Sequence, residues 1–251
     1  MDQIGIFGGT FNPIHTRELM IGQCALEQFG LTKVIFMPNG SPPHKKTDLL
    51  DRESRFEMVV AAVADNLKFE ASRLEIDRPG TTWTIDTLKQ LREQYGDGAK
   101  LNFICGEDVL NSLEIYDRRA EFFKLCDRLL VSPRDSVRPG MLDEMRKRLP
   151  EATIEMIDCP ADGRSSTLIR TWIRAGKSVR YLVAPAVHAL LVAKKHYQVV
   201  APPPAPEVKE VPVEPPAAAP EKEQPVALPP SPAPVTATVV SLDTGKGDKV
   251  A

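Results

Sequence analysis

Short apolar stretches alternate with longer segments of helical periodicity along the first 198 residues, and this alternation limits the possible folds more than any other feature. The first stretch, residues 3–7, ends in Gly8-Gly9 and is followed by a helix-like pattern over residues 16–30. A second stretch at 34–37 precedes a second helical pattern at 51–65. Because strands joined through helices are normally parallel, we predict an α/β fold with a doubly wound parallel sheet.

The same periodicities predict the remaining strands and helices, and they indicate that the folded part ends in a C-terminal helical part. Strands are expected at 73–76, 101–105, 129–131 and 153–157. Helices are expected at 84–95, 119–125, 141–149, 166–175 and 185–194.

The chain changes character near residue 199. All 15 aromatic residues precede that position, whereas 13 of the 23 prolines lie in residues 201–251. A segment rich in Pro, Ala, Val and Glu without aromatic residues cannot bury enough surface to form a core. We therefore expect a domain over residues 1–198 and a disordered tail over 199–251, acting as a solvated spacer or as a segment that docks to a protein partner.

Charge and cysteine content exclude several classes of protein. The formal net charge is -2, from 32 basic and 34 acidic residues, so a dominant nucleic-acid-binding surface is not expected. The four cysteines contain no C-x-x-C pair, which argues against a zinc site or a disulfide framework. No apolar run is long enough for a membrane span and no signal peptide is recognisable, so we expect a cytoplasmic protein without a membrane partner.

The sharpest motif lies between the first strand and the first helix. It reads Gly-Gly-Thr-Phe-Asn-Pro-Ile-His over residues 8–15. Glycines there let the backbone approach a ligand, and the N-terminus of the following helix presents unpaired N–H groups and a partial positive charge to phosphate. The motif therefore predicts a phosphate-bearing ligand.

With this motif the sequence resembles the nucleotidyltransferase superfamily, whose signature is Gly-x-Phe-Asp-Pro followed by a His-x-x-His pair. Three further segments resemble the bacterial nicotinate-nucleotide adenylyltransferases more closely: Pro-Asn-Gly-Ser-Pro-Pro-His-Lys at 38–45, Trp-Thr-Ile-Asp-Thr-Leu at 83–88 and Phe-Ile-Cys-Gly-Glu-Asp at 103–108. Ser-Ser-Thr-Leu-Ile-Arg at 165–170 resembles the late phosphate motif of the superfamily. The resemblance implies a Rossmann-like nucleotidyltransferase fold.

The resemblance also implies a reaction and a set of site residues. The phosphate of nicotinate mononucleotide would attack the α-phosphorus of ATP, with Mg²⁺, to give deamido-NAD and pyrophosphate, with His15 and Arg170 as catalytic residues. The residues implied to bind ATP are Gly8, Gly9, Thr10, Phe11, His15, Ser165, Ser166, Thr167 and Arg170. Those implied to bind the mononucleotide are His44, Lys45, Trp83, Thr84, Asp108 and Tyr116.

The His-x-x-His pair of the family pattern is incomplete in this sequence. Glu18 stands where the second histidine of the motif is expected, and its carboxylate should repel phosphate near the helix N-terminus. Arg17 could offset that charge by binding phosphate, or it could point to solvent or pair with a carboxylate. Besides an active enzyme, a catalytically impaired nucleotide-binding regulator or scaffold of the same fold remains an alternative.

Overall fold

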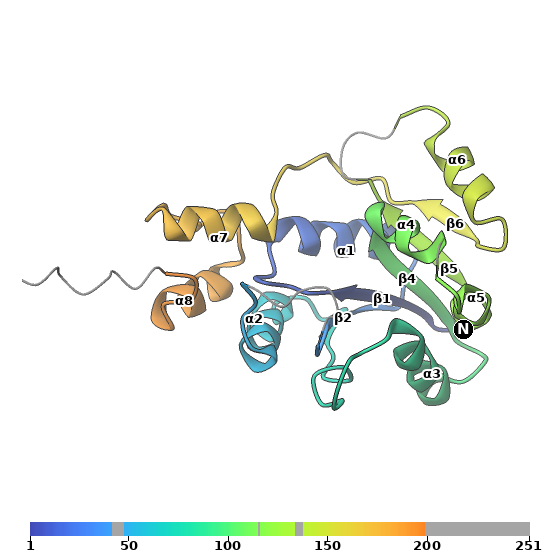
Figure 1. The fold of residues 1–251 in the computed structure, drawn as a ribbon, viewed down its shortest axis with the longest axis horizontal. Helices are drawn as coiled ribbons and strands as arrows, with labels where there is room; N and C mark the ends of the chain where they lie inside the picture. Colours follow the sequence, from blue (N-terminus) through green and yellow to red (C-terminus); the bar gives the residue numbers. More distant parts are fainter. Residues whose placement is uncertain (42–47, 115, 134–137, 199–251) are drawn as a thin grey trace, which may run out of the picture. The chain divides into compact units, whose positions relative to one another are not determined.

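Six parallel strands form the centre of the protein (Figure 1). The structure is a computed structural model, and it describes residues 1–41, 48–114, 116–133 and 138–198. The strand order is β3-β2-β1-β4-β5-β6. The strands are β1 (Gln3–Gly9), β2 (Lys33–Pro38), β3 (Phe69–Ala71), β4 (Lys100–Gly106), β5 (Arg128–Ser132) and β6 (Ile154–Met156).

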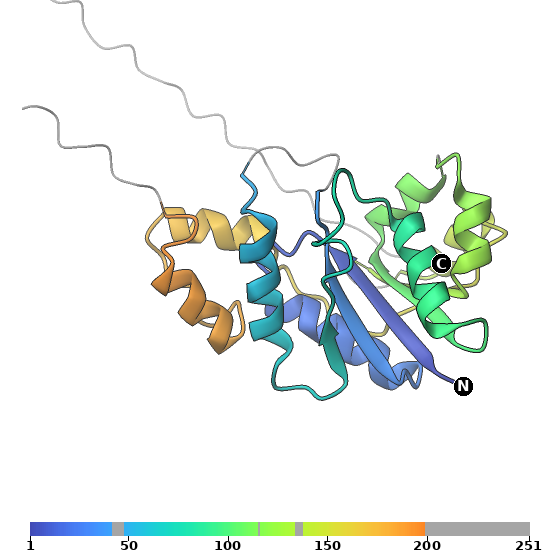
Figure 2. The same ribbon diagram turned by 90° about the horizontal axis from the view of Figure 1, so that it is seen from below.

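Eight helices cover the two faces of this sheet within the described residues. They are α1 (Thr16–Gln28), α2 (Arg52–Val63), α3 (Thr84–Tyr95), α4 (Asp108–Glu114), α5 (Arg119–Leu125), α6 (Met141–Arg148), α7 (Ser166–Arg174) and α8 (Pro185–Ala193). In Figure 2 the cyan and orange helices α2, α7 and α8 lie on one side of the strands, and the green helix α3 lies on the other. None of the helices in the described part of the chain is long and apolar enough to cross a membrane.

The core consists of two hydrophobic clusters, one on each face of the sheet. Side chains alternate between the faces along each strand: Phe7 and Phe36 join the cluster with α1, α2, α7 and α8, whereas Ile6 and Ile35 join the cluster with α3 to α6. Strands that are apolar on both faces are typical of a parallel sheet covered on both sides. The predicted α/β fold with a doubly wound parallel sheet is thus confirmed.

The element predictions hold with one error and one omission. The strand predicted at 73–76 is wrong, because residues 74–76 form a turn in which the N–H of Asp77 bonds to the carbonyl of Arg73 at 2.9 Å. The strand in this region is β3, which pairs with β2 at one edge of the sheet and ends just before this turn. Helix α4 was not predicted. The domain boundary at 198/199 stays a prediction, because the tail lies outside the described residues.

Candidate active site

The candidate site lies where the direction of chain winding changes. From β1 the chain continues into α1 on one face, whereas from β4 it continues into α4 on the other, and the two strands are neighbours in the sheet. In open α/β sheets such a switch point leaves a crevice at the carboxyl ends of the strands. A cavity of about 540 Å³ occurs here. It is lined by Phe7, His15, Arg17, Glu18, Ile21, Gly106, Asp108, Ser132, Asp162, Gly163, Arg164, Ser165 and Thr167.

His15 begins α1 at the wall of this cavity. It is the N-cap residue, in extended conformation, and only 6% of its surface is exposed. Its backbone N–H donates a 2.9 Å hydrogen bond to Oε2 of Glu18, and its Nε2 lies 3.7 Å from the same oxygen. Its buried Nδ1 has no hydrogen-bond partner among the described residues. The imidazole is therefore held beside the helix N-terminus with one nitrogen available for a ligand.

Burial decides the charge of His15. The pKa of this imidazole is lowered from 6.5 to about 4, chiefly by desolvation and in part by the nearby Arg17 and Arg164, whereas Asp162 opposes the shift. A group with that pKa is neutral at pH 7. His15 can thus donate one hydrogen bond to a phosphate oxygen, but the positive charge must come from other groups.

Two arginines near His15 can provide that charge. Nη2 of Arg17 donates a 2.8 Å hydrogen bond to the carbonyl of Pro133, so this side chain does not simply point to solvent. Nε of Arg164 lies 2.9 Å from Oδ2 of Asp162, and its Nη1 bonds to the hydroxyl of Thr16. Arg17 and Arg164 both line the cavity, and guanidinium groups are well suited to phosphate oxygens.

The N-terminus of α7 faces the site next to that of α1. Ser165 is its N-cap and accepts a 3.2 Å hydrogen bond from the N–H of Leu168. The hydroxyl of Ser166 donates to the carbonyl of Pro13 at 2.9 Å, which ties the start of α7 to the loop before α1. Two helix N-termini beside one cavity favour an anionic ligand.

Arg170 and Thr10 line a smaller neighbouring cavity of about 250 Å³, which also includes Thr167. Nε of Arg170 lies 2.8 Å from Oδ2 of Asp48, and its Nη1 donates to the carbonyl of Asn12 at 2.9 Å. The guanidinium therefore already has a carboxylate partner. Thr167 connects the two cavities, since it lines both.

The glycine motif has a packing role that the sequence did not reveal. A Cβ atom on Gly9 would lie 2.9 Å from the ring of Phe11. Phe11 is 1% exposed and packs against Phe7 and Phe36, so only its backbone is available to a ligand. At Gly8 a Cβ would lie in ordinary contact, 3.6 Å from Phe103. The absence of a side chain at Gly9 thus makes room for the protein's own aromatic ring.

The residues expected to bind the mononucleotide are only partly brought together. Asp108, at the start of α4, lines the main cavity. Trp83, the N-cap of α3, is 46% exposed, Thr84 is exposed and Tyr116 is half-buried, and none of these three lines that cavity. His44 and Lys45 lie outside the described residues.

Arg55 supports the site and was missed by the sequence reasoning. It is 1% exposed, and its guanidinium donates to the carbonyls of Thr10 at 2.9 Å, Asn39 at 2.7 Å and Gly40 at 3.1 Å. These bonds join the loop after β1 to the end of β2. A signal was present: Arg55 falls on the same face of α2 as the buried Met58 and Val59.

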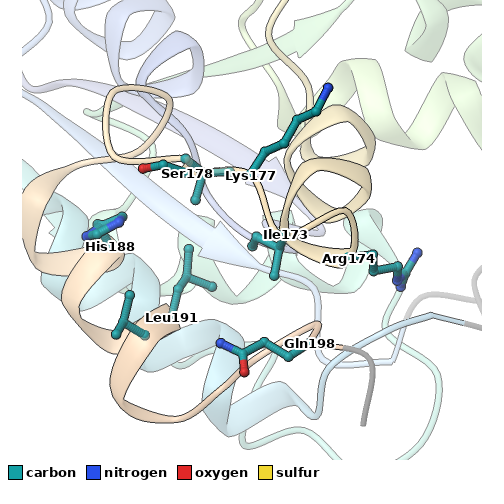
Figure 3. A pocket seen from close by; sticks show the side chains of 10 residues that line it. Ile173, Arg174, Lys177, Ser178, His188, Leu191 and Gln198 are labelled. Carbon is teal, nitrogen blue, oxygen red and sulfur yellow. The ribbon is translucent and has the colours of Figure 1, made fainter. Parts of the chain in front are cut away.

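A further cavity, of about 490 Å³, lies between α7 and α8 (Figure 3). Its lining includes Ile173, Lys177 and Ser178 on and after α7, and His188 and Leu191 on α8. It shares no lining residue with the cavity at His15. No residue of the phosphate motifs lines it. The candidate site is therefore the cavity at His15, at the carboxyl ends of β1 and β4.

Comparisons with known proteins show the family of the chain. Residues 6–172 match the cytidylyltransferase-like family. A relative from Moorella thermoacetica, named "Probable nicotinate-nucleotide adenylyltransferase", is 36% identical over 200 residues, covering 78% of this chain and 92% of the relative. A relative of the same name from Caldicellulosiruptor saccharolyticus is 39% identical over 202 residues, covering 78% and 99%.

Solved structures share the fold. The Plasmodium falciparum nicotinic acid mononucleotide adenylyltransferase complexed with NaAD superposes with a TM-score of 0.66 at 16% identity, covering 78% of this chain and 98% of that one. A structure described as a "Putative Nicotinate-nucleotide Adenylyltransferase from Vibrio parahaemolyticus" gives a TM-score of 0.52 at 22% identity, covering 78% of this chain and 96% of that one. By its sequence matches, the chain belongs to the cytidylyltransferase-like family and, within it, to the nicotinate-nucleotide adenylyltransferases.

Proposed function

We propose that this protein transfers the adenylyl group of ATP to nicotinate mononucleotide, releasing pyrophosphate and forming deamido-NAD. The observation that carries the proposal is the meeting of two helix N-termini, those of α1 at His15 and α7 at Ser165, beside one cavity at the switch point. An ATP triphosphate is the kind of ligand that such an arrangement binds. The family membership of the chain supports the same reaction.

Positioning and charge stabilisation account for the catalysis we propose. In adenylyl transfer a phosphate oxygen of the acceptor attacks the α-phosphorus, and negative charge builds up on the departing pyrophosphate. Neutral His15 would donate a hydrogen bond to that charge, while Arg17 and Arg164 supply positive charge. The hydroxyls of Ser165 and Thr167 and the N–H groups of α7 would hold the terminal phosphates.

The acceptor would enter from the β4 side of the cavity. Asp108 lies there and is suited to bind nucleotide hydroxyls. Trp83 and Tyr116 could stack on the pyridine ring, with Thr84 beside it, provided that they approach the cavity when the ligand binds. An ion pair of 3.8 Å between Arg118 and Asp86 already joins the first turn of α3 to the segment after Tyr116. His44 and Lys45 complete the set proposed for the mononucleotide.

Mg²⁺ would enter as part of the ATP complex. Among the described residues no group of three His, Cys, Asp or Glu side chains could hold a metal ion. Of the three carboxylates in the cavity, Glu18 bonds to the N–H of His15, Asp162 pairs with Arg164, and Asp108 is the one proposed to bind nucleotide hydroxyls. The phosphates of ATP would therefore provide most of the oxygen ligands, which is how proteins commonly bind this ion.

We also propose that the protein works in the cytoplasm. All four cysteines, Cys24, Cys105, Cys126 and Cys159, are free thiols, and reduced thiols are typical of that compartment.

The direct test is to incubate the purified full chain with ATP, Mg²⁺ and either nicotinate or nicotinamide mononucleotide. We expect pyrophosphate release together with a dinucleotide product, detected by chromatography, and faster turnover with the nicotinate form. The matched control is His15→Ala, which should retain the fold and lose most of the activity. ATP binding without pyrophosphate release from either acceptor would reject the enzyme and favour a nucleotide-binding regulator.

A further inference from the structure

The connection between β6 and α7 runs back along α1 toward the site. At the C-terminal end of α1, Nε2 of Gln28 donates to the carbonyl of Met156 at 2.9 Å, and its Oε1 accepts from the N–H of Asp158 at 2.8 Å. At the N-terminal end, Arg164 bonds to Thr16. The connection is therefore attached to α1 at both ends of the helix.

Two cysteines lie near each other between these attachments. Cys24 lies one helical turn before Gln28 and Cys159 directly follows Asp158, so the hydrogen bonds of Gln28 to this connection bring the two thiols close together. Both side chains are half-buried and pack against the same hydrophobic cluster. Cys24 also lines a surface cavity together with Asp158, so a small reagent can reach this position.

The two other cysteines provide a contrast within the same protein. Cys105 is 3% and Cys126 is 5% exposed, and burial raises the pKa of both thiols. The Cys126 thiol donates to the backbone carbonyl of Arg128 at 3.2 Å. Buried, protonated thiols of this kind react slowly with external reagents.

We propose that Cys24 and Cys159 form a redox modification site, at which a small-molecule disulfide converts the two thiols to an intramolecular disulfide bond. The thiolate of Cys24 attacks one sulfur of the reagent, forming a mixed disulfide and releasing one thiolate. Cys159 then loses its proton and attacks the Cys24 sulfur, which releases the second thiol. Two protein thiols are oxidised and one reagent disulfide is reduced to two thiols, so atoms and electrons balance.

The order of attack follows from the environment of Cys159. Burial and the neighbouring Cys24 thiol raise the pKa of Cys159 to about 12, so this thiol holds its proton while Cys24 is reduced. Once Cys24 is in a mixed disulfide, it can no longer carry the negative charge that opposes deprotonation of its neighbour. Because Cys24, and not Cys159, lines the surface cavity, Cys24 is the attacking thiol and Cys159 the resolving thiol.

The bond would restrain a segment that contributes to the candidate site. Cys159 is three residues before Asp162 and five before Arg164, and both of these line the main cavity. A covalent link from Cys159 to the middle of α1 would limit the motion of residues 159–165. This inference does not depend on the proposed reaction, because it concerns the thiols and the backbone alone.

The test treats the full chain with oxidised glutathione and counts free thiols. We expect four thiols before treatment and two after it, a mass loss of two hydrogens, and a Cys24–Cys159 peptide in a non-reducing digest. Cys105 and Cys126 should stay free. The bond should also slow amide hydrogen exchange in residues 159–165, and reduction should reverse the change.

Single substitutions separate the roles of the two thiols. Cys159→Ser should accumulate one glutathione on Cys24, whereas Cys24→Ser should stay unmodified; circular dichroism checks that both variants fold. Four free thiols after treatment, a disulfide between two chains, or glutathione on Cys159 in the Cys24→Ser variant would each overturn the proposal.

Discussion

The carboxylate of Glu18 accepts a 2.9 Å hydrogen bond from the backbone N–H of His15 and lies 3.7 Å from Nε2 of that residue. This one side chain therefore favours the stability of α1 but disfavours the binding of phosphate. It caps an N–H group at the start of α1, and it brings negative charge to a cavity suited to phosphate. The sequence predicted only the second effect.

Glu18→Gln should separate these effects, because the amide oxygen can still accept the bond from His15 while the charge is removed. We expect kcat/KM for ATP to rise about 3- to 10-fold, on the order of 1 kcal/mol for a partly screened charge. Glu18→Ala, the matched control, loses the cap as well and should lower the melting temperature by roughly 3 °C.

Glu18→His tests the sequence-based prediction that a carboxylate at this position repels phosphate. The variant has an imidazole near the phosphates but lacks the carboxylate that caps the N–H of His15, so we expect a faster reaction and a less stable protein. A slower reaction of the Gln and His variants, with a weaker dependence on Mg²⁺ concentration, would instead mean that Glu18 helps to hold the metal ion.

His15→Ala should lower kcat by roughly 10²-fold, the usual loss when a principal hydrogen-bond donor to developing charge is removed. ATP affinity should change less, since Arg17, Arg164 and the two helix N-termini remain. Steady-state kinetics and ATP binding by calorimetry measure the two quantities separately. Unchanged turnover in a folded variant would remove His15 from the mechanism.

The lowered pKa of His15 also predicts a dependence of stability on pH. The unfolded imidazole, with a pKa of 6.5, binds a proton more readily than the folded one, whose pKa is about 4. Stability is therefore fully present above pH 6.5 and is lost as the pH falls toward 4, by up to roughly 3 kcal/mol. Urea unfolding of the wild type and His15→Gln at pH 7 and pH 4.5 checks this. An equal loss in both proteins would contradict the assignment.

Arg55→Met should be strongly destabilising, because it leaves the carbonyls of Thr10, Asn39 and Gly40 without their buried donor. We expect a loss of roughly 3 kcal/mol or more in the free energy of unfolding. Arg52→Met is the matched control on the same helix. Because Arg52 is exposed, its substitution should lower the free energy of unfolding by less than about 0.5 kcal/mol. Similar losses for the two variants would show that the bonds of Arg55 contribute little.

Truncation after Tyr197 should change the melting temperature by less than about 4 °C and leave activity intact, because the tail has no aromatic residues and too few large apolar ones to contribute to a core. Truncation after Lys195 is the informative control. It removes Tyr197, whose hydroxyl donates a 2.6 Å hydrogen bond to Oδ1 of Asn12 in the loop before α1. We expect only the shorter protein to melt at a lower temperature, as followed by circular dichroism.

Much of the fold could be predicted from local patterns. The alternation of strands and helices predicted the parallel sheet, because apolar residues recur at a different spacing in a strand than in a helix. The error at 73–76 has a local origin: Leu74 and Ile76 alternate with polar neighbours as in a strand, but the backbone closes a turn between Arg73 and Asp77. A strand also needs a partner, and alternation cannot show whether one is present.

The sequence by itself determined the alternating α/β architecture and the family resemblance, and it predicted a phosphate site at residues 8–15, because these depend on residue order and short-range spacing. Only the tertiary structure decided that His15 is neutral, that Glu18 caps α1 and that Arg55 joins two loops. It also brought Cys24 and Cys159 together across 135 residues of chain. Charge state, capping and thiol pairing depend on which distant groups surround a side chain, and folding of the sheet and its helices sets those neighbours.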